Sequence, residues 1–275
     1  MKTILVPTDF SENAINAFHY AVELSDALQA KLILLNARHI PVLASELQLE
    51  DITLGTMIEE TTEQLKEFRT GRMEPGKHVD VEDLVMTGLA VDAIVLAAKE
   101  RKADLVVMGT KGASGLEEIL LGSNTAAAME KSPCPVLAVP EKATFQGLKK
   151  IVFATNYNDS DTQSLNYLVE IASIFNAEII IVHISEIIRD DEFESSVFRL
   201  YKDKIQNEVA YRNLSFHLIP MMDVAKGLNA FAEENQIDLI AVSARKRNII
   251  TKLFDRSLTK KMACHTHIPF LSIHR

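Results

Sequence analysis

The chain has 275 residues, of which 47% are hydrophobic and 24% are charged, proportions typical of globular domains and not of collagen-like or disordered chains. Its net charge of −9 argues against a general nucleic-acid binder, and no apolar run approaches the roughly 18 residues that cross a bilayer. Two cysteines, Cys134 and Cys264, form no disulfide framework, and the N-terminus shows no basic-then-apolar leader, so we expect a cytoplasmic protein without membrane or nucleic-acid partners.

The first half of the chain alternates predicted strands and helices. Residues 3–8 form a short, continuous apolar segment, the pattern of a strand that is buried on both faces of a parallel sheet. Ser11 is the predicted N-cap of a helix that runs to Leu28. Further strands are predicted at residues 31–37, 79–86, 104–108 and 135–139, and further helices at residues 46–70, 91–101 and 123–131. This alternation favours a doubly wound α/β fold with a parallel sheet between two helix layers.

The chain also contains an internal repeat. The aligned pairs of segments are 4–10 with 151–157, 32–35 with 179–182, 104–107 with 238–241, and 135–137 with 269–271. Two divergent copies of one domain explain these pairs better than chance does. We therefore predict a first domain at residues 1–140, a linker at 141–148 and a second domain at 149–275.

Polar and glycine residues follow two of the predicted strands. Asp9 comes after the first strand, and a glycine-rich segment with Gly109 and Gly112 comes after the strand 104–108. In an open parallel sheet, ligands bind outside the carboxyl ends of the strands. Glycines there allow positive φ and let backbone N–H groups approach a phosphate. Gly122, Ser123 and Asn124 precede a helix, whose start is a ready anion site.

Each of these features also has a simpler interpretation. Asp9 suits a turn or a cap, Gly109 and Gly112 could merely turn the chain, and Ser123 could merely cap a helix. Their combination at neighbouring strand ends favours a polyphosphate site, with Asp9 accepting hydrogen bonds from a ribose or a base. Neither GxxxxGK[ST] nor GxGxxG occurs, which disfavours those two classes of nucleotide-binding protein.

These segments resemble the universal stress proteins. The resemblance rests on ILVPTDFS at residues 4–11, DLVVMGTKG at 104–112 and SPCPVL at 132–137. The spacing of Gly109, Gly112 and the pair Gly122-Ser123 is similar to that of the ATP-binding subset of the family. The likeness extends over both halves, so the chain resembles a tandem universal stress protein. The resemblance implies two domains, each with five parallel strands in the order 3-2-1-4-5.

The resemblance also implies ligand contacts, with ATP bound with or without Mg²⁺. Asp9 would contact the adenosine portion. The residues expected around the phosphates are Gly109, Gly112, Gly122, Ser123 and Asn124, and those expected to line the base pocket are Pro7, Ala37 and Met108. Because the family forms homodimers, we expect the two copies to pack as an intramolecular pseudo-dimer, with a homodimer of chains as an alternative and an unknown protein as partner.

The second copy departs from this motif. Asn156, Ser243, Lys246 and Arg256 stand where the first copy has Asp9, Gly109, Gly112 and Gly122, although Ser257 keeps the hydroxyl of Ser123. Side chains resist positive φ and fill the space that a phosphate needs. The second copy is therefore predicted not to bind ATP in the same way.

Other candidates are weaker. His265 and His267 form an HxH pair without a convergent set of further ligands, so no metal site is predicted. Cys134 precedes an apolar strand and suits a buried thiol better than a nucleophile. The basic segment 245–261 suits a solvated face better than an anion-binding or interface patch.

These inferences favour a sensor or signalling module that binds adenine nucleotide in its first domain, and we name no catalytic residue. A slow ATP hydrolase or phosphotransferase is one alternative, although no general base or Walker-type carboxylate accompanies the glycine segment. A scaffold that binds no nucleotide is the other.

Overall fold

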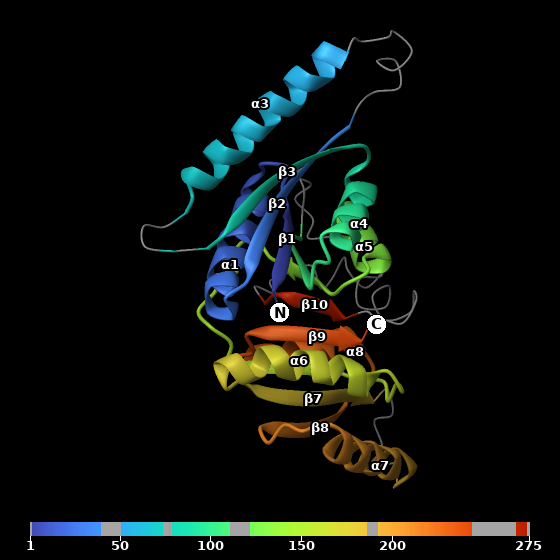
Figure 1. Ribbon diagram of the computed structural model, residues 1–275. Helices are drawn as coiled ribbons and strands as arrows, with labels where there is room; N and C mark the ends of the chain where they lie inside the picture. Colours follow the sequence, from blue (N-terminus) through green and yellow to red (C-terminus); the bar gives the residue numbers. More distant parts are fainter. Residues whose placement is uncertain are drawn as a thin grey trace. The chain divides into compact units, whose positions relative to one another are not determined.

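A computed structural model gives the fold of the chain. It describes residues 2–39, 51–73, 77, 79–110, 122–185, 192–243 and 268–273, with side chains from residue 55 onward in the second range. These residues divide into two compact units, the first ending at Phe145 and the second containing Gln146 and the residues after it. Figure 1 labels the helices and strands of both units.

Unit 1 is a parallel α/β domain. Its strands are β1 (Thr3–Pro7), β2 (Lys31–Arg38), β3 (Val81–Thr87), β4 (Leu105–Gly109) and β5 (Val136–Val139), and its helices are α1 (Glu12–Leu28), α3 (Asp51–Thr70), α4 (Ala90–Glu100) and α5 (Ser123–Lys131). The strands lie in the order β3-β2-β1-β4-β5, and each neighbouring pair is parallel. Helix α1 covers one face of this sheet and α4 and α5 cover the other (Figure 1). The predicted fold class and strand order are confirmed for this unit.

The central position of β1 explains its continuous apolar sequence. Ile4, Leu5 and Val6 are completely buried, because β1 pairs with a strand on each side and lies beneath helices on both faces. Removing such side chains from water stabilises a fold by about 1.5–3 kcal/mol each. The alternation of polar and apolar residues that marks a half-exposed strand would be destabilising here.

Helix α1 begins as the sequence predicts. The Oγ of Ser11 accepts a hydrogen bond from the backbone N–H of Ala14 at 3.3 Å, which satisfies one of the amides left free at a helix start. The predicted apolar face is buried, including Ala17 and Phe18. The helix ends at Leu28, and its C-cap, Gln29, adopts the left-handed conformation with φ 51°.

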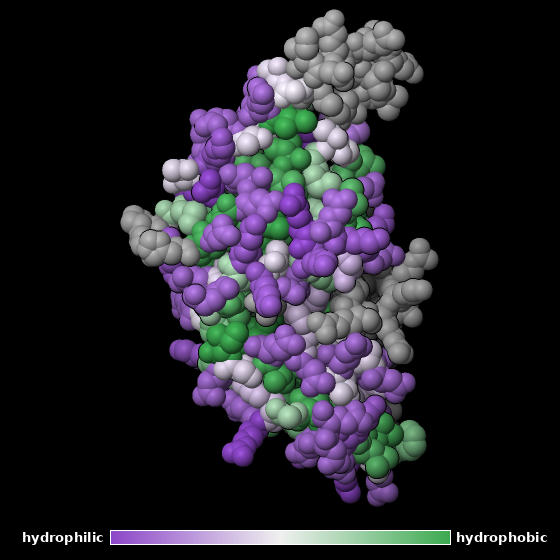
Figure 2. Space-filling view, in the orientation of Figure 1, coloured by the Kyte–Doolittle hydropathy of each residue, from purple (hydrophilic) through white to green (hydrophobic). Residues whose placement is uncertain are grey.

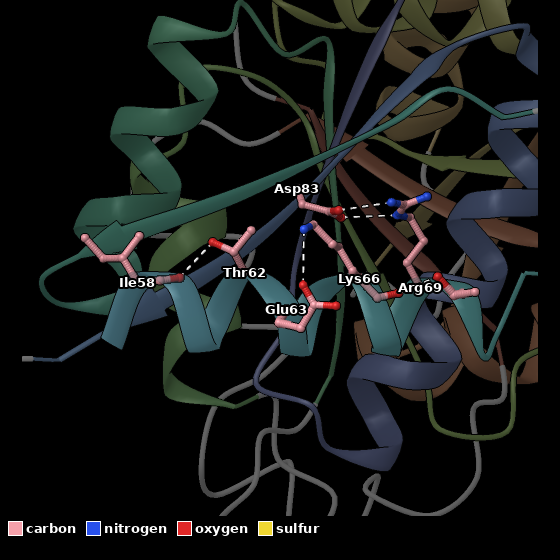
Figure 3. Close-up of polar contacts among 7 residues, drawn as sticks. Ile58, Thr62, Glu63, Lys66, Arg69 and Asp83 are labelled. Atoms are coloured by element: carbon pink, nitrogen blue, oxygen red, sulfur yellow. Dashed lines mark hydrogen bonds and ion pairs between the residues drawn. The ribbon is translucent and has the colours of Figure 1, made fainter. Parts of the chain in front are cut away.

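Helix α3 docks on the sheet through its C-terminal half. Leu65 and Phe68 are buried, whereas Ile58 nearer the N-terminus is partly exposed. Arg69 pairs with Asp83 of β3, with 3.1 Å between Nη2 and Oδ2 (Figure 3). The same figure shows the ion pair of Lys66 and Glu63, both exposed, which stabilises a helix by only a few tenths of a kcal/mol.

Unit 2 repeats this arrangement. Its strands are β6 (Lys150–Ala154), β7 (Glu178–Ser185), β8 (Leu214–Pro220), β9 (Leu239–Ser243) and β10 (Phe270–Ile273), and its helices are α6 (Asp161–Phe175), α7 (Glu192–Glu208) and α8 (Val224–Glu234). The order β8-β7-β6-β9-β10 is that of unit 1, again with parallel neighbours. Helix α8 packs on a core of β6, β7 and β9 side chains that includes Val152, Val182 and Ile240. Helix α6 covers the opposite face (Figure 1).

The predicted linker is packed against α1 over part of its length. The side-chain amide of Asn16 donates to the carbonyl of Pro140 at 2.8 Å and to that of Ala143 at 2.9 Å. The ring of Phe145 meets that of Tyr20 edge-on, with centroids 5.1 Å apart. Up to Phe145, this segment is therefore an ordered extension of unit 1, held by side-chain contacts.

The surface in Figure 2 is mostly hydrophilic, with scattered apolar areas. One green area at the lower right of that view lies where Figure 1 draws α7, the helix that carries the exposed residues Phe193 and Leu200. Scattered exposed apolar residues are ordinary on a protein surface. None of the helices in the described part of the chain is both long and apolar enough to cross a membrane.

Candidate functional site

The turn after β1 positions Asp9. The backbone N–H of Thr8 bonds to the carbonyl of Leu35, which keeps the chain on the sheet until β1 has ended. The Oδ1 of Asp9 then accepts from the backbone N–H of Ser11 at 3.1 Å and from its hydroxyl at 2.6 Å. Asp9 therefore has the local turn role that one interpretation assigned to it. The same bonds hold its carboxylate at the carboxyl end of β1.

A second segment of the site joins the end of β4 to the start of α5. The N–H of Gly122 donates to the carbonyl of Thr110 at 2.6 Å, and the hydroxyl of Thr125 donates to the carbonyl of Gly109 at 2.8 Å. Gly122 is the N-cap of α5 and has no side chain with which to cap it. The first amides of a helix have no partner within the helix, so those of Ser123 and Asn124 are suited to an anion.

The reason for glycine at position 109 differs from the one the sequence suggested. We expected glycine there to allow positive φ, but among the described glycines only Gly88 and Gly147 have it. A Cβ on Gly109 would lie 2.9 Å from the backbone oxygen of Asn13, a distance that real Cβ atoms do not reach. Glycine is therefore required because α1 crosses close to the end of β4. Gly122, with φ −55°, has a conformation open to any residue.

These segments surround one cavity of about 360 Å³ in unit 1. Its lining comes from the ends of β1, β2 and β4 and from the starts of α1, α4 and α5. The residues are Pro7, Thr8, Asp9, Ala14, Leu35, Asn36, Ala37, Ala90, Ile94, Met108, Gly109, Gly122, Ser123, Asn124 and Thr125. All the predicted site residues lie in this set except Gly112, which is outside the described residues.

Several lining residues were not predicted. Ala90 and Ile94 belong to α4, which packs across β2, and no local motif indicates that they face a cavity. Asn36 is 5% exposed, and its Nδ2 donates to the carbonyl of Thr8 at 2.8 Å. Of these unpredicted lining residues, only Asn36 could have been found from the sequence, because an asparagine is unusual inside an otherwise apolar strand.

The chemistry of the lining is mostly apolar and uncharged. Asp9 is the only ionisable side chain among the described lining residues. Pro7, Ala37 and Met108 offer surface to a flat apolar group, while the hydroxyls of Ser123 and Thr125 and the amide of Asn124 lie at the start of α5. Thr8 and Asn36 add a hydroxyl and an amide near the ends of β1 and β2. The cavity therefore combines an apolar part, one carboxylate and one helix start whose amides are suited to an anion, a division that suits a ligand with an aromatic end and an acidic end.

The equivalent region of unit 2 is built differently. Ser243 occupies the position of Gly109, and its Oγ lies 3.0 Å from that of Ser160 and 3.1 Å from that of Ser164. Asp161 aligns with Ala14 of the unit 1 cavity, and it is completely buried. Lys246, Arg256 and Ser257 lie outside the described residues, as do His265, His267 and the basic segment 245–261.

Two other predictions concern reactive groups. Cys134 is buried, as predicted, and this burial raises the pKa of its thiol, which disfavours the thiolate that a nucleophile needs. Within the described ranges, no group of three His, Cys, Asp or Glu side chains could hold a metal ion.

Comparison with known proteins gives the family. The profile of the universal stress protein family matches residues 1–140 and again 147–274. Universal stress protein MJ0531 of Methanocaldococcus jannaschii is 33% identical over 141 residues, which cover 50% of this chain and 81% of that protein. Universal stress protein Slr1230 of Synechocystis is 21% identical over 99% of both chains.

A solved structure agrees over the whole chain. The crystal structure of a universal stress protein from Archaeoglobus fulgidus has a TM-score of 0.73 at 20% identity, covering 99% of this chain and 96% of that one. This likeness supports the fold. With two matches of the family profile and the doubly wound fold in each unit, the chain belongs to the universal stress protein family, with two such domains in tandem.

Proposed function

We propose that unit 1 binds ATP or a related adenine nucleotide and that the protein acts as a stress-response sensor or signalling module. One observation carries this proposal: a single cavity is lined by the end of β1, the end of β4 and the uncapped start of α5. Cavities of this size take small-molecule ligands.

Each part of the lining suits one part of the nucleotide. Adenine would lie against Pro7, Ala37 and Met108, which offer apolar surface. The carboxylate of Asp9 would accept hydrogen bonds from the ribose hydroxyls. The phosphates would meet the amides that begin α5, with Gly122, which has no side chain, keeping that side open. Mg²⁺ would accompany the phosphates, because the described lining supplies no basic side chain to neutralise them.

Binding without sustained turnover is the expected activity. Asp9 is the only ionisable side chain in the described lining, and in this arrangement it is committed to the ribose and not to an attacking water. Hydrolysis would need a group that orients the nucleophile at the terminal phosphate. Release of phosphate over many turnovers would favour the hydrolase alternative.

Titration calorimetry of the full chain with ATP and with adenosine tests the proposal. Gly122→Lys places a long side chain where the phosphates would lie, and the φ of −55° accepts any residue, so the fold is expected to persist. We expect the variant to lose ATP binding and to keep most of its adenosine affinity.

Gly55→Lys is the matched control, because Gly55 lies outside the cavity lining and a Cβ added to it would meet nothing within 4 Å. This variant should bind ATP like the unmodified chain. No binding of either ligand by the unmodified chain would support the nucleotide-free scaffold, and undiminished ATP binding by folded Gly122→Lys would refute this site.

A further inference from the structure

Helix α3 of unit 1 and helix α7 of unit 2 follow the second strand of their sheets, and the side chains that pack against these two helices differ. In unit 1, Phe68 of α3 packs against Phe10 and Phe18, with ring centroids 5.5 and 5.4 Å apart. In unit 2, Tyr157 aligns with Phe10 and lies 5.1 Å from the ring of Tyr201 in α7. The rings that pack on α3 are phenylalanines, whereas those that pack on α7 carry hydroxyls. The polar contacts of α3, from Arg38 to Thr61 and from Arg69 to Asp83, use arginines, which stay charged.

His183 of β7 lies among the side chains that pack against α7. It is 8% exposed, and its ring stacks on that of Tyr157 with centroids 4.1 Å apart. Its Nδ1 is 2.8 Å from the carbonyl oxygen of Thr155, and its Nε2 is 3.1 Å from Oε1 of Glu194 in α7. The same Oε1 accepts a hydrogen bond from the hydroxyl of Tyr157 at 3.1 Å. Glu194 thus links α7 to β7 and to the turn after β6.

Both ring nitrogens of His183 face oxygens that accept hydrogen bonds. The Thr155 carbonyl has no hydrogen to donate, so Nδ1 must carry one. A neutral ring would then direct the lone pair of Nε2 at the Glu194 carboxylate. The contact is attractive only when the pair holds one further proton, as imidazolium and carboxylate.

Unit 1 offers an internal comparison. Asn36 aligns with His183, and its Nδ2 donates to the carbonyl of Thr8 at the same 2.8 Å. The first of the two histidine bonds therefore has a counterpart that does not titrate. The second bond, to Glu194, is the feature that unit 2 adds.

The other titratable groups around the pair are few in the described part of unit 2. Burial raises the pKa of the Tyr157 and Tyr201 hydroxyls, so both remain hydrogen-bond donors. Burial also raises the pKa of Asp161, which accepts from Tyr201 at 2.8 Å, and Lys204 of α7 acts on that carboxyl from a distance. On β8, His217 packs against Phe231 of α8.

We propose that His183 and Glu194 form a pH-sensitive latch for α7, independent of nucleotide binding in unit 1. The buried residues of α7 are Tyr201 and Ile205, both in its C-terminal half. The N-terminal half contacts the rest of unit 2 through Glu194 and through Phe198, whose ring centroid lies 6.4 Å from that of Tyr157. Histidine changes charge between about pH 5 and 8. When the pair loses its proton, Nε2 and Oε1 repel each other and this half of α7 separates from the sheet.

Hydrogen exchange of the full chain, measured by mass spectrometry at about pH 6 and about pH 8.5, tests the latch. After correction for intrinsic exchange, we expect the N-terminal half of α7 to lose protection about tenfold at the higher pH, the effect of one hydrogen bond to a charged group. Helix α3, docked by Phe68, serves as the internal reference and is expected to show no comparable loss.

His183→Asn keeps the bond to Thr155, as Asn36 does in unit 1, and removes the latch. The N-terminal half of α7 should then be weakly protected at both pH values. His217→Asn is the matched control and should keep the pH dependence. Asp161→Asn should keep it too, because that change removes the other buried carboxyl and leaves the latch in place.

Glu194→Gln gives a second test in case His183→Asn disturbs folding. The amide of glutamine donates to a neutral Nε2, so α7 should stay protected at about pH 8.5. Two results would overturn the latch: equal protection of α7 at both pH values in the unmodified chain, or a pH dependence that survives in both variants.

Discussion

Asp161 shows how one buried carboxyl distinguishes the two copies. It aligns with Ala14, a lining residue of the unit 1 cavity, and is completely buried at the start of α6. Its Oδ2 accepts from the hydroxyls of Tyr201 and Thr155 and from the backbone N–H of Asn158, whereas its buried Oδ1 has no hydrogen-bond partner among the described residues. Removing a carboxylate from water is costly, and here the three donors offset only part of that cost.

The pH dependence of stability follows from this environment. Burial raises the pKa of Asp161, so the folded carboxyl holds its proton where the unfolded one has lost it. The stability that the chain gains from this protonated carboxyl is complete below the ordinary pKa of about 4, and it is lost as the pH rises through the raised pKa of the folded state. Asn keeps an oxygen acceptor and does not ionise. Relative to Asp161→Asn, the unmodified chain should therefore lose stability between about pH 4 and about pH 7.

Urea unfolding of both chains at these two pH values, followed by tyrosine fluorescence, measures the difference. A stability difference that is the same at both values would show that Asp161 binds as many protons in the folded chain as in the unfolded one, and would contradict the raised pKa.

At the scale of elements, the crossing of α1 over the end of β4 determines the shape of the site. This crossing brings the backbone of Asn13 against Gly109 and sets Ala14 beside the cavity. In unit 2 the same crossing accommodates Ser243, whose hydroxyl lies between those of Ser160 and Ser164. Gly109 thus allows α1 to lie close to β4. The position of α1 in turn sets the position of the turn at Asp9, which directly precedes the helix.

Gly109→Ala should destabilise unit 1 by about 1–3 kcal/mol, because the added methyl group forces α1 away from β4. ATP affinity should fall with it, since Ala14 and the Asp9 turn move with the helix. Gly55→Ala is the matched control: nothing lies within 4 Å of its Cβ, and alanine in a helix is favoured by about 0.5–1 kcal/mol. Chemical unfolding compares the two, and a Gly109→Ala chain as stable as the unmodified one would contradict the close contact.

At the scale of the whole molecule, the two domains share a fold and differ in the residues at the corresponding site. Unit 1 has Asp9, Ala14 and Gly109 where unit 2 has Asn156, Asp161 and Ser243. Each change disfavours a nucleotide at the corresponding place in unit 2. Asn156 lacks the negative charge of the acceptor, Asp161 adds a buried carboxyl, and Ser243 adds a side chain where unit 1 has none. Asp161 adds to the differences that the motif alone indicated.

We therefore expect one ATP per chain. Titration calorimetry of the full chain should give a stoichiometry of one, and Gly122→Lys should remove all of the binding, because its site is the only one used. Two ATP per unmodified chain would contradict this prediction, as would a single site that persists in the folded variant.

The sequence by itself determined the elements, the repeat and most of the residues that line the candidate site. Short apolar segments such as residues 4–6 indicate buried parallel strands, and Ser11 marks the start of α1, because these signals act between residues near in the chain. Asp9, Gly109 and Gly122 were predicted to lie together because a βα fold brings strand ends to one edge, and all three line the unit 1 cavity. Pro7, Ala37 and Met108, which line it too, were predicted from the resemblance to universal stress proteins. The presence of two copies of one domain followed from comparing the two halves of the chain.

Only the tertiary structure decided which distant side chains meet. Ala90 and Ile94 line the cavity because α4 crosses β2, and Gly109 is glycine because α1 crosses β4. His183 and Glu194 meet across the packing of α7 on β7. Local propensity carries no information on such contacts, because they depend on how a helix is placed over a sheet. The physical reason is that packing, unlike helix or strand formation, is a property of surfaces assembled from separate segments.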